Sequence, residues 1–294
     1  MDSARRNANL ILLLAAAIWG FAFVAQRVGM RHIEPLTFNG IRFGLGAVVL
    51  TPVAWFLTRR GIDLKPARPA GNGFCLRASL LTGIFIFGGS TLQQFGVVYT
   101  TAGKAGFITS LYVVFVPILG LVTGQKTGRW TWWGALLAAV GLYLLSIRGW
   151  TGIELGDGLV LIGALFWASH VLTVGKVSDR IDPLRLAIGQ FTVCSVLSLI
   201  GALIFESFVW ESIRAAALPI AYAGLLSVGV AYTLQLVGQR NAQPAHAAII
   251  LSFESVFAVM GGWLILSEGL TPRAMAGCAL MLLGVILAQR EPSR

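Results

Sequence analysis

The fold is decided by residues 249–268, which read Ile-Ile-Leu-Ser-Phe-Glu-Ser-Val-Phe-Ala-Val-Met-Gly-Gly-Trp-Leu-Ile-Leu-Ser-Glu. About 20 mostly apolar residues are enough for a helix to cross the ~30 Å hydrocarbon core of a bilayer. Glu254 lies inside this segment, where an ionisable side chain costs roughly 2.5–3.5 kcal/mol on insertion scales. Because such residues usually face a bundle interior or a water-filled cavity, Glu254 is a candidate functional residue. The alternative is a structural role, in which Glu254 caps backbone groups or pairs with a basic residue such as Arg42.

The whole chain has the composition of an integral membrane protein. Of its 294 residues, 56% are hydrophobic and 12% are charged, whereas soluble proteins carry about 25% charged residues. The mean hydropathy is +0.80. The net charge of +10 does not indicate nucleic-acid binding, because the basic residues are scattered between apolar runs. We therefore expect membrane lipid and a small-molecule substrate as partners, and no nucleic acid.

Ten apolar segments predict an all-α integral membrane fold with ten transmembrane helices. A helix bundle is required because the segments are much longer than barrel strands and every backbone group in lipid must be satisfied internally. The first run is too long for the apolar core of a secretory signal peptide. The segments are 10–26, 36–57, 78–98, 105–124, 132–147, 159–175, 184–204, 216–237, 245–266 and 274–288.

Lysine and arginine positions predict the orientation in the cytoplasmic (inner) membrane. If the N-terminus is cytoplasmic, 15 of the 22 basic residues fall in cytoplasmic segments and 6 on the opposite side, with Arg42 inside a span. An excess of basic residues in cytoplasmic loops is the usual determinant of topology. This distribution predicts a multi-pass protein whose N- and C-termini are both cytoplasmic.

The chain contains an internal repeat. Three sets of residues recur in the same order, at spacings of 148, 142 and 143 residues. The pair Trp19 and Pro35 recurs as Trp167 and Pro183. The segment Thr91-Leu92-Gln93 recurs as Thr233-Leu234-Gln235, and the pair Gly134 and Gly141 recurs as Gly277 and Gly284. We predict two five-helix repeats, residues 1–149 and 150–294. Tandem units with an odd number of spans lie in opposite orientations, which is the inverted-repeat architecture of secondary transporters. A duplication retained only for packing is the alternative.

Four motifs resemble those of the EamA family of the drug/metabolite transporter superfamily. They are Ala17-Ile-Trp-Gly-Phe-Ala-Phe, Glu34-Pro35 followed by Arg42, Tyr99-Thr-Thr-Ala-Gly-Lys-Ala-Gly-Phe-Ile-Thr, and Ser252-Phe-Glu-Ser-Val-Phe-Ala. The resemblance covers nearly the whole chain. It implies a 5+5 inverted-repeat bundle and export or exchange of small metabolites, and relatives include YddG-type exporters of aromatic amino acids. This chain departs from the family pattern at Ser255, where proline is frequent, and at Gln125-Lys126, where glutamate is frequent.

Aromatic and amide side chains inside the spans are candidate substrate-binding residues. Trp19, Phe23 and Gln26 share one helical face, as do Trp167 and His170. An aromatic pocket with a few amides and hydroxyls suits a small amphipathic ligand. Interfacial anchoring of aromatic rings and hydrogen bonds between helices are the alternatives. The full set is Trp19, Phe23, Gln26, Gln93, Gln94, Tyr99, Tyr112, Trp167, His170, Tyr232, Gln235, Ser252 and Glu254.

Two candidates could couple transport to protons. Glu254 could exchange a proton, bind a substrate ammonium group, or form a permanent ion pair with Arg42. His170 could carry a proton or make an interhelical hydrogen bond. Pro117 removes a backbone hydrogen bond inside a predicted helix, and Gly261-Gly262 falls in the corresponding part of the second repeat. These residues are hinge candidates, with passive packing as the alternative.

The sequence favours a secondary transporter over two other classes. A membrane-embedded enzyme acting on a small amphipathic substrate would need a catalytic motif, and neither H-E-x-x-H nor G-x-S-x-G occurs. A channel would need a filter-like loop. The chain has no P-loop, and Cys75, Cys194 and Cys278 lack metal-ligand spacing. We therefore expect a transporter that is not an enzyme and uses no cofactor or metal. The resemblance to the EamA family implies small metabolites, amino acids foremost, as its small-molecule substrates.

Overall fold

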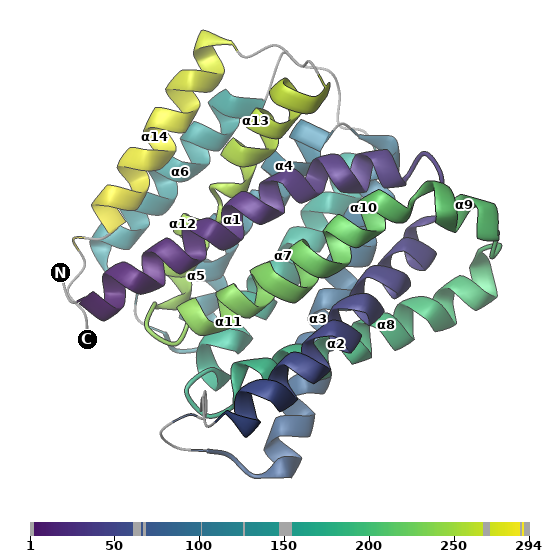
Figure 1. The fold of residues 1–294 in the computed structure, drawn as a ribbon. Helices are drawn as coiled ribbons and strands as arrows, with labels where there is room; N and C mark the ends of the chain where they lie inside the picture. Colours follow the sequence, from purple (N-terminus) through teal and green to yellow (C-terminus); the bar gives the residue numbers. More distant parts are fainter. Residues whose placement is uncertain are drawn as a thin grey trace.

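The computed structural model describes residues 3–60, 66, 69–100, 102–125, 127–146, 155–266, 271–288 and 290, and every regular element in these ranges is a helix (Figure 1). The predicted boundary between residues 149 and 150 lies outside the described residues. The elements are α1 (Ser3–Gly29), α2 (Pro35–Arg59), α3 (Asn72–Tyr99), α4 (Ala102–Ser110), α5 (Tyr112–Val122), α6 (Arg129–Ser146), α7 (Leu155–Val177), α8 (Pro183–Phe205), α9 (Trp210–Ala215), α10 (Ala217–Ala221), η1 (Tyr222–Tyr232), α11 (Thr233–Gly238), α12 (Pro244–Leu251), α13 (Glu254–Leu266) and α14 (Pro272–Ala288).

The bundle is an all-helical membrane protein. Within the described residues, eight helical segments are long and apolar enough to cross a bilayer, and α14 contributes a shorter apolar helix. Many large apolar side chains point outward, including Val122 at 83% exposed and Leu203 at 73% exposed. Contiguous apolar surface of this kind is costly in water and is what lipid covers in a membrane protein. The helix α6 packs against α14. Together with the eight longer segments, these two helices account for the ten predicted apolar segments.

Two of the predicted helices are interrupted in the middle, which the sequence did not predict. The segment 105–124 divides into α4 and α5 at Leu111, and the segment 245–266 divides into α12 and α13 at Ser252-Phe253. Tighter turns close each break, because the backbone N–H of Val114 bonds to the carbonyl of Leu111 and that of Ser255 to the carbonyl of Ser252. The two breaks lie at equivalent positions of the repeat, because Leu111 and Phe253 are separated by the same number of residues, 142, as the two Thr-Leu-Gln segments.

The segment 216–237 also differs from a plain α-helix. Its central part, η1, is a π-helix flanked by α10 and α11. Long π-helices are rare, and π-helical turns occur frequently at functional sites. The wider turn places Ser227 and Tyr232, five residues apart, on one side of the element, where both line the same cavity. An α-helical period would not have paired them.

The helices α6 and α14 cross through close glycine contacts. A Cβ atom on Gly134 would lie 2.7 Å from the carbonyl oxygen of Gly284, and one on Gly141 would lie 2.6 Å from that of Gly277. The later glycine of α6 therefore meets the earlier glycine of α14, so the two helices are antiparallel. Small residues allow helix backbones in membranes to approach this closely.

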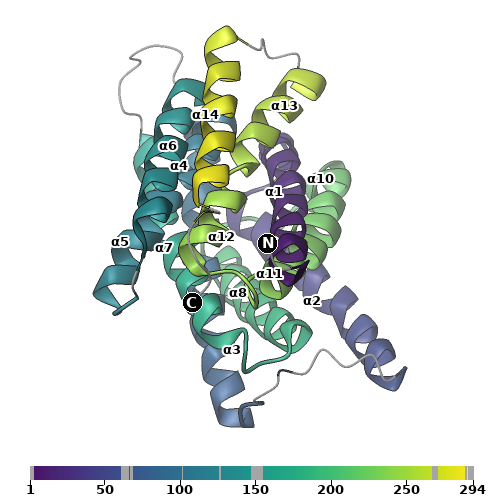
Figure 2. The same cartoon turned by 90° about the vertical axis from the view of Figure 1, so that its left-hand side faces the viewer.

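The helices α2 and α8 form a second antiparallel pair. At one end, the carboxylate of Glu206 accepts hydrogen bonds from the backbone N–H groups of Leu36 and Thr37, each at 2.7 Å. At the other end, Asp182 caps its own helix by accepting from Leu184 and Arg185. The start of α1 and the end of α14 lie close together on one side of the bundle (Figures 1 and 2).

The hinge candidates lie within continuous helix. Pro117 is inside α5, and Gly261 and Gly262 are inside α13. A Cβ atom on Gly261 would contact Phe21 of α1 at 3.0 Å. The interruptions of regular helix fall instead at Leu111 and Ser252-Phe253. A hinge role for Pro117, Gly261 and Gly262 stays a prediction.

Candidate functional site

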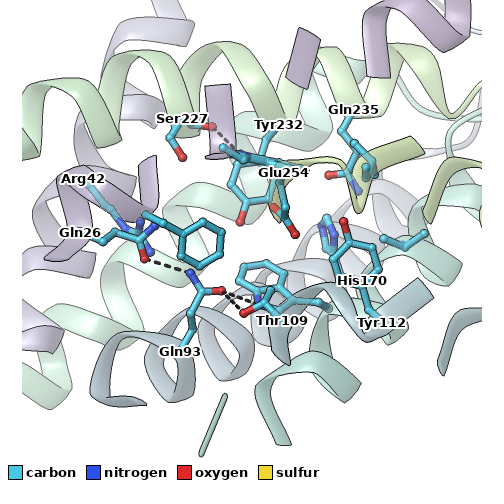
Figure 3. A pocket seen from close by; sticks show the side chains of 15 residues that line it. Gln26, Arg42, Gln93, Thr109, Tyr112, His170, Ser227, Tyr232, Gln235 and Glu254 are labelled. Atoms are coloured by element: carbon cyan, nitrogen blue, oxygen red, sulfur yellow. Dashed lines mark hydrogen bonds between the residues drawn. The ribbon is translucent and has the colours of Figure 1, made fainter. Parts of the chain in front are cut away.

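A central cavity lies where segments from both halves of the chain meet. The space in it that a water molecule can reach is about 50 Å³, which is smaller than typical small-molecule sites of roughly 300–1,000 Å³. Figure 3 shows aromatic and polar side chains pointing into it from several helices. The lining residues are Trp19, Phe23, Gln26, Arg42, Gln93, Thr109, Tyr112, Trp167, His170, Val171, Ser227, Tyr232, Gln235, Leu251 and Glu254.

Aromatic rings form the walls of this cavity, with Tyr232 at their centre. The ring of Trp19 meets Tyr232 edge to face, with centroids 4.7 Å apart. Trp167 lies 6.2 Å from Tyr232, and His170 lies 6.0 Å from it at 87°. Phe191 packs on the same ring at 5.6 Å. Such offset and edge-to-face contacts are the preferred aromatic geometries, so the walls present flat apolar surface in a defined arrangement.

The side chain of Gln93 organises a hydrogen-bonded network on one side of the cavity. Its Nε2 donates to Oε1 of Gln26 at 2.9 Å. Its Oε1 accepts from Nε1 of Trp167 at 3.0 Å and from Oγ1 of Thr109 at 3.4 Å. A buried carboxamide with partners on both ends is fixed in orientation. Four helical segments, α1, α3, α4 and α7, are held together by this residue.

Glu254 is the first residue of α13 and lies directly after the helix break. It is 5% exposed. The partial positive charge at a helix N-terminus stabilises a carboxylate in this position. The helix α1 reaches it closely, because a Cβ atom on Gly20 would lie 2.6 Å from the carbonyl oxygen of Glu254. The hydroxyl of Tyr112 lies beside the carboxyl group but makes no hydrogen bond of acceptable geometry.

Among the described residues, Ser110 makes one long hydrogen bond to Glu254, and the hydroxyl of Tyr112 lies beside the same carboxyl group. The hydroxyl of Ser255 donates to the carbonyl of Gly106 at 2.9 Å. The hydroxyl of Ser110 is hydrogen-bonded to Oγ of Ser255. Each hydroxyl has one proton, so the remaining contact from Ser110 to Oε1 of Glu254, at 3.4 Å, is secondary. The carboxyl group is therefore open to a proton or a ligand.

Arg42 contributes a buried guanidinium group from the middle of α2. The residue is 3% exposed, and its guanidinium carbon lies 4.9 Å from the ring of Phe43 and 5.4 Å from that of Phe38. Its Nε has no hydrogen-bond partner. The ion pair with Glu254 is not found in the described part of the chain, where each of the two interacts electrostatically with other groups. Arg42 faces the cavity instead.

His170 is held by a single side chain. Its Nε2 lies 3.1 Å from Oε1 of Gln190. Since a carboxamide oxygen can only accept, Nε2 carries the proton and Nδ1 is left as the acceptor of the neutral ring. The interhelical hydrogen bond, one of the two alternatives for this histidine, is therefore present.

Ten of the thirteen predicted binding residues line the cavity, and three do not. Gln94 is buried, with neither amide atom hydrogen-bonded. Tyr99, at the end of α3, is 55% exposed. Ser252 is buried at the helix break, where its hydroxyl donates to the carbonyl of Ile249. Their participation in binding stays a prediction.

Five lining residues were not among the candidates: Arg42, Thr109, Val171, Ser227 and Leu251. Arg42 was considered only as an ion-pair partner, although an intramembrane charge is itself a signal for a site. Thr109 lies three residues before Tyr112, so the helical spacing could have found it. Ser227 could not have been found this way, because its position depends on the π-helix.

Helices of bilayer length around a central cavity lined by aromatic and polar side chains define a polytopic membrane protein. The profile of the EamA-like transporter family matches residues 6–147 and, a second time, residues 154–289. The chain belongs to the EamA-like transporter family and is a multi-pass membrane transporter with repeated halves.

Two similar proteins are also described as transporters. An uncharacterized transporter of Archaeoglobus fulgidus is 36% identical over 284 residues, covering 96% of this chain and 86% of the relative. The uncharacterized transporter YoaV of Bacillus subtilis is 25% identical over 94% of both chains. One protein crystal structure shares the fold with a TM-score of 0.75, at 18% identity and 96% coverage of both chains.

Proposed function

We propose that the chain is a secondary transporter that exports small amphipathic metabolites across the cytoplasmic membrane by alternating access. Amino acids with apolar or aromatic side chains are the foremost substrates, as the resemblance to YddG-type exporters implies. The observation that carries this proposal is the cavity, whose lining combines aromatic rings with amide, hydroxyl and charged groups. Segments from both halves build it, as is typical of transporter sites between structural repeats.

The proposed architecture is ten transmembrane helices in two inverted five-helix repeats, with both termini cytoplasmic. The glycine contacts between α6 and α14 support it. Gly134 contacts Gly284, and the residues at the equivalent positions of the other repeat, Gly277 and Gly141, also contact each other. A two-fold axis in which equivalent residues swap partners produces this pattern. The orientation rests on the distribution of basic residues.

The two interrupted helices supply a plausible means of movement in this proposal. Discontinuous helices at repeat interfaces place helix ends at the substrate site of many transporters. Here Tyr112 and Glu254 each begin a half-helix, α5 and α13, and both face the cavity. Glu254 would bind a substrate ammonium group or exchange a proton, and His170 would provide a second proton site.

Uptake into proteoliposomes tests the proposal. The purified protein would be reconstituted and supplied with radiolabelled tryptophan, phenylalanine and leucine, with and without a pH gradient. Saturable uptake that unlabelled substrate competes away is expected, together with counterflow. Empty liposomes control for leakage. If a broad panel of metabolites gave no saturable flux, the transporter proposal for this cavity would be wrong, whereas uptake of other metabolites alone would remove the amino-acid substrates.

A further inference from the structure

One end of the cavity combines the guanidinium group of Arg42 with the carboxamide of Gln26, whose NH₂ group is a hydrogen-bond donor. Arg42 and Gln26 point into the cavity from the same side in Figure 3. Oε1 of Gln26 already accepts from Gln93, and its NH₂ group is the donor that Gln26 can offer to a ligand. The Nε of Arg42 has no hydrogen-bond partner. These donors form a set with no matching acceptor.

The charge of Arg42 is not balanced by an acidic side chain of the described residues. Its closest stabilising contacts are the faces of Phe38 and Phe43. Cation–π contacts attract a cation but accept none of its N–H hydrogen bonds. Arginine inside a membrane usually has an anionic or carbonyl partner or faces a water-filled cavity. A ligand with an anionic group would complete its coordination.

We propose that Arg42 and the amide nitrogen of Gln26 form a carboxylate-binding subsite, so that the substrate is an organic carboxylate with an apolar or aromatic body. This inference rests on the proposed transport function and deepens it. A planar guanidinium group recognises a carboxylate through paired N–H donors. The rings of Trp19, Trp167 and Tyr232 then receive the body of the substrate.

The charge of the cavity favours a carboxylate over a phosphate. Arg42 is the one guanidinium or ammonium group among its lining residues, and Glu254 adds a carboxyl group to the same space. A dianionic phosphate would face that carboxyl group with a single cation, whereas a monoanion is neutralised by Arg42 alone. A substrate that also carries an ammonium group can use Glu254 for it.

Three indole compounds separate the roles of the charges: tryptophan, indole-3-propionate and tryptamine. Each would be titrated against the purified protein, with binding read from thermal stabilisation. The subsite requires that tryptophan and indole-3-propionate bind to the wild type. The variant Arg42→Gln should weaken both by about 10- to 100-fold, as expected for loss of a charge-assisted hydrogen bond. Tryptamine, which lacks the carboxylate, should change less than about twofold by the same reasoning.

Two further variants guard against a folding artefact. Arg42→Lys keeps the charge and loses the paired donors, so it should weaken the two carboxylates less than Arg42→Gln does and leave tryptamine unaffected. Arg214→Gln removes an exposed arginine of α9 that lies outside the cavity, and it should bind all three compounds like the wild type. Equal weakening of tryptamine and the carboxylates by both Arg42 variants would overturn the subsite and assign Arg42 a structural role.

The outcome can be separated from that of the transport proposal. If indole-3-propionate and tryptophan did not bind to the wild type, the carboxylate subsite would be wrong. Saturable uptake of a metabolite without a carboxylate in proteoliposomes would, in that case, leave the transport function intact. Inorganic phosphate is a further competitor. If phosphate displaced bound tryptophan as strongly as indole-3-propionate does, the assignment of a carboxylate subsite would also be contradicted.

Discussion

Gln93 and Gln235 occupy matched positions in the two Thr-Leu-Gln segments, but their surroundings differ. Gln93 has partners on both ends of its carboxamide. Oε1 of Gln235 is buried and has none. Both residues line the cavity. The glutamine of the first half is therefore fixed by its partners, whereas the carboxamide oxygen of the second is buried without one.

The difference follows from the residues that surround each glutamine. Thr109 donates to Gln93, whereas Leu251, at the matched position in the second half, has no polar group. Trp167 donates to Gln93, but its repeat mate Trp19 donates to the carbonyl of Ser227 in the π-helix, at 3.1 Å. The backbone plan is repeated, and side-chain divergence makes the cavity asymmetric.

The charged residues show the same asymmetry. Glu254 is matched in the first half by Tyr112, and Arg42 by Gln190. Gln190 is committed to His170, while Arg42 and Glu254 face the cavity without pairing with each other. An inverted repeat with identical halves would treat both membrane sides alike. In the proposed transporter, a cation in the first half and a carboxyl group in the second would give the substrate a single preferred orientation.

The largest expected effect comes from Glu254 and its counterpart. Glu254→Gln should lower the initial rate of uptake by about 10- to 100-fold, since one lost interaction with a charged group is worth roughly 1.5–3 kcal/mol. Tyr112→Phe should change the rate less than about threefold, because its hydroxyl forms no hydrogen bond of good geometry. Proteoliposome uptake at matched protein density measures both, and equal losses would remove the proposed asymmetry.

The next effect concerns stability. Gln93→Leu leaves the indole N–H of Trp167 and the carboxamide of Gln26 without a partner, so the loss should be about 2–4 kcal/mol. Gln235→Leu removes an already unsatisfied acceptor and should cost less than about 1 kcal/mol. Thermal unfolding in detergent compares the two variants. A larger loss for Gln235→Leu would show that its carboxamide has a structural role.

A smaller effect tests the place where the halves should be equivalent. Gly134→Ala and Gly284→Ala each put a methyl group 2.7 Å from the carbonyl oxygen of the other residue. Both should destabilise the protein by a similar amount, about 1–3 kcal/mol. Gly158→Ala, where a Cβ atom meets nothing within 4 Å, is the matched control and should be neutral or slightly stabilising. Unequal costs for the glycine pair would argue against an exact two-fold relation.

The smallest effect comes from making the first half resemble the second. Thr109→Val removes the hydroxyl that donates to Gln93 at 3.4 Å, while Trp167 keeps the same acceptor satisfied. The expected loss is about 0.5–1 kcal/mol, measured by thermal unfolding. A loss comparable to that of Gln93→Leu would mean that Thr109, not Gln93, holds the network together.

Much of the fold is predictable from the sequence because membrane helices are determined locally. The apolar runs locate the ends of the helical segments to within seven residues, since backbone groups in lipid must be satisfied within each helix. The two matches to one family confirm the repeat that the Thr-Leu-Gln pairs predict. Ten of the candidate binding residues line one cavity because a helical face is also a local property.

The tertiary structure alone decided where the helices break, where the π-helix lies and which polar groups remain without partners. The break at Ser252-Phe253 interrupts a run that is apolar by composition, so hydropathy could not locate it. The hydrogen bonds of Gln93 depend on side chains far away in the sequence, Gln26 and Trp167. The chain itself determines its spans and its repeat, whereas hydrogen-bond partners depend on which helices pack together. That packing made two similar halves into one asymmetric cavity.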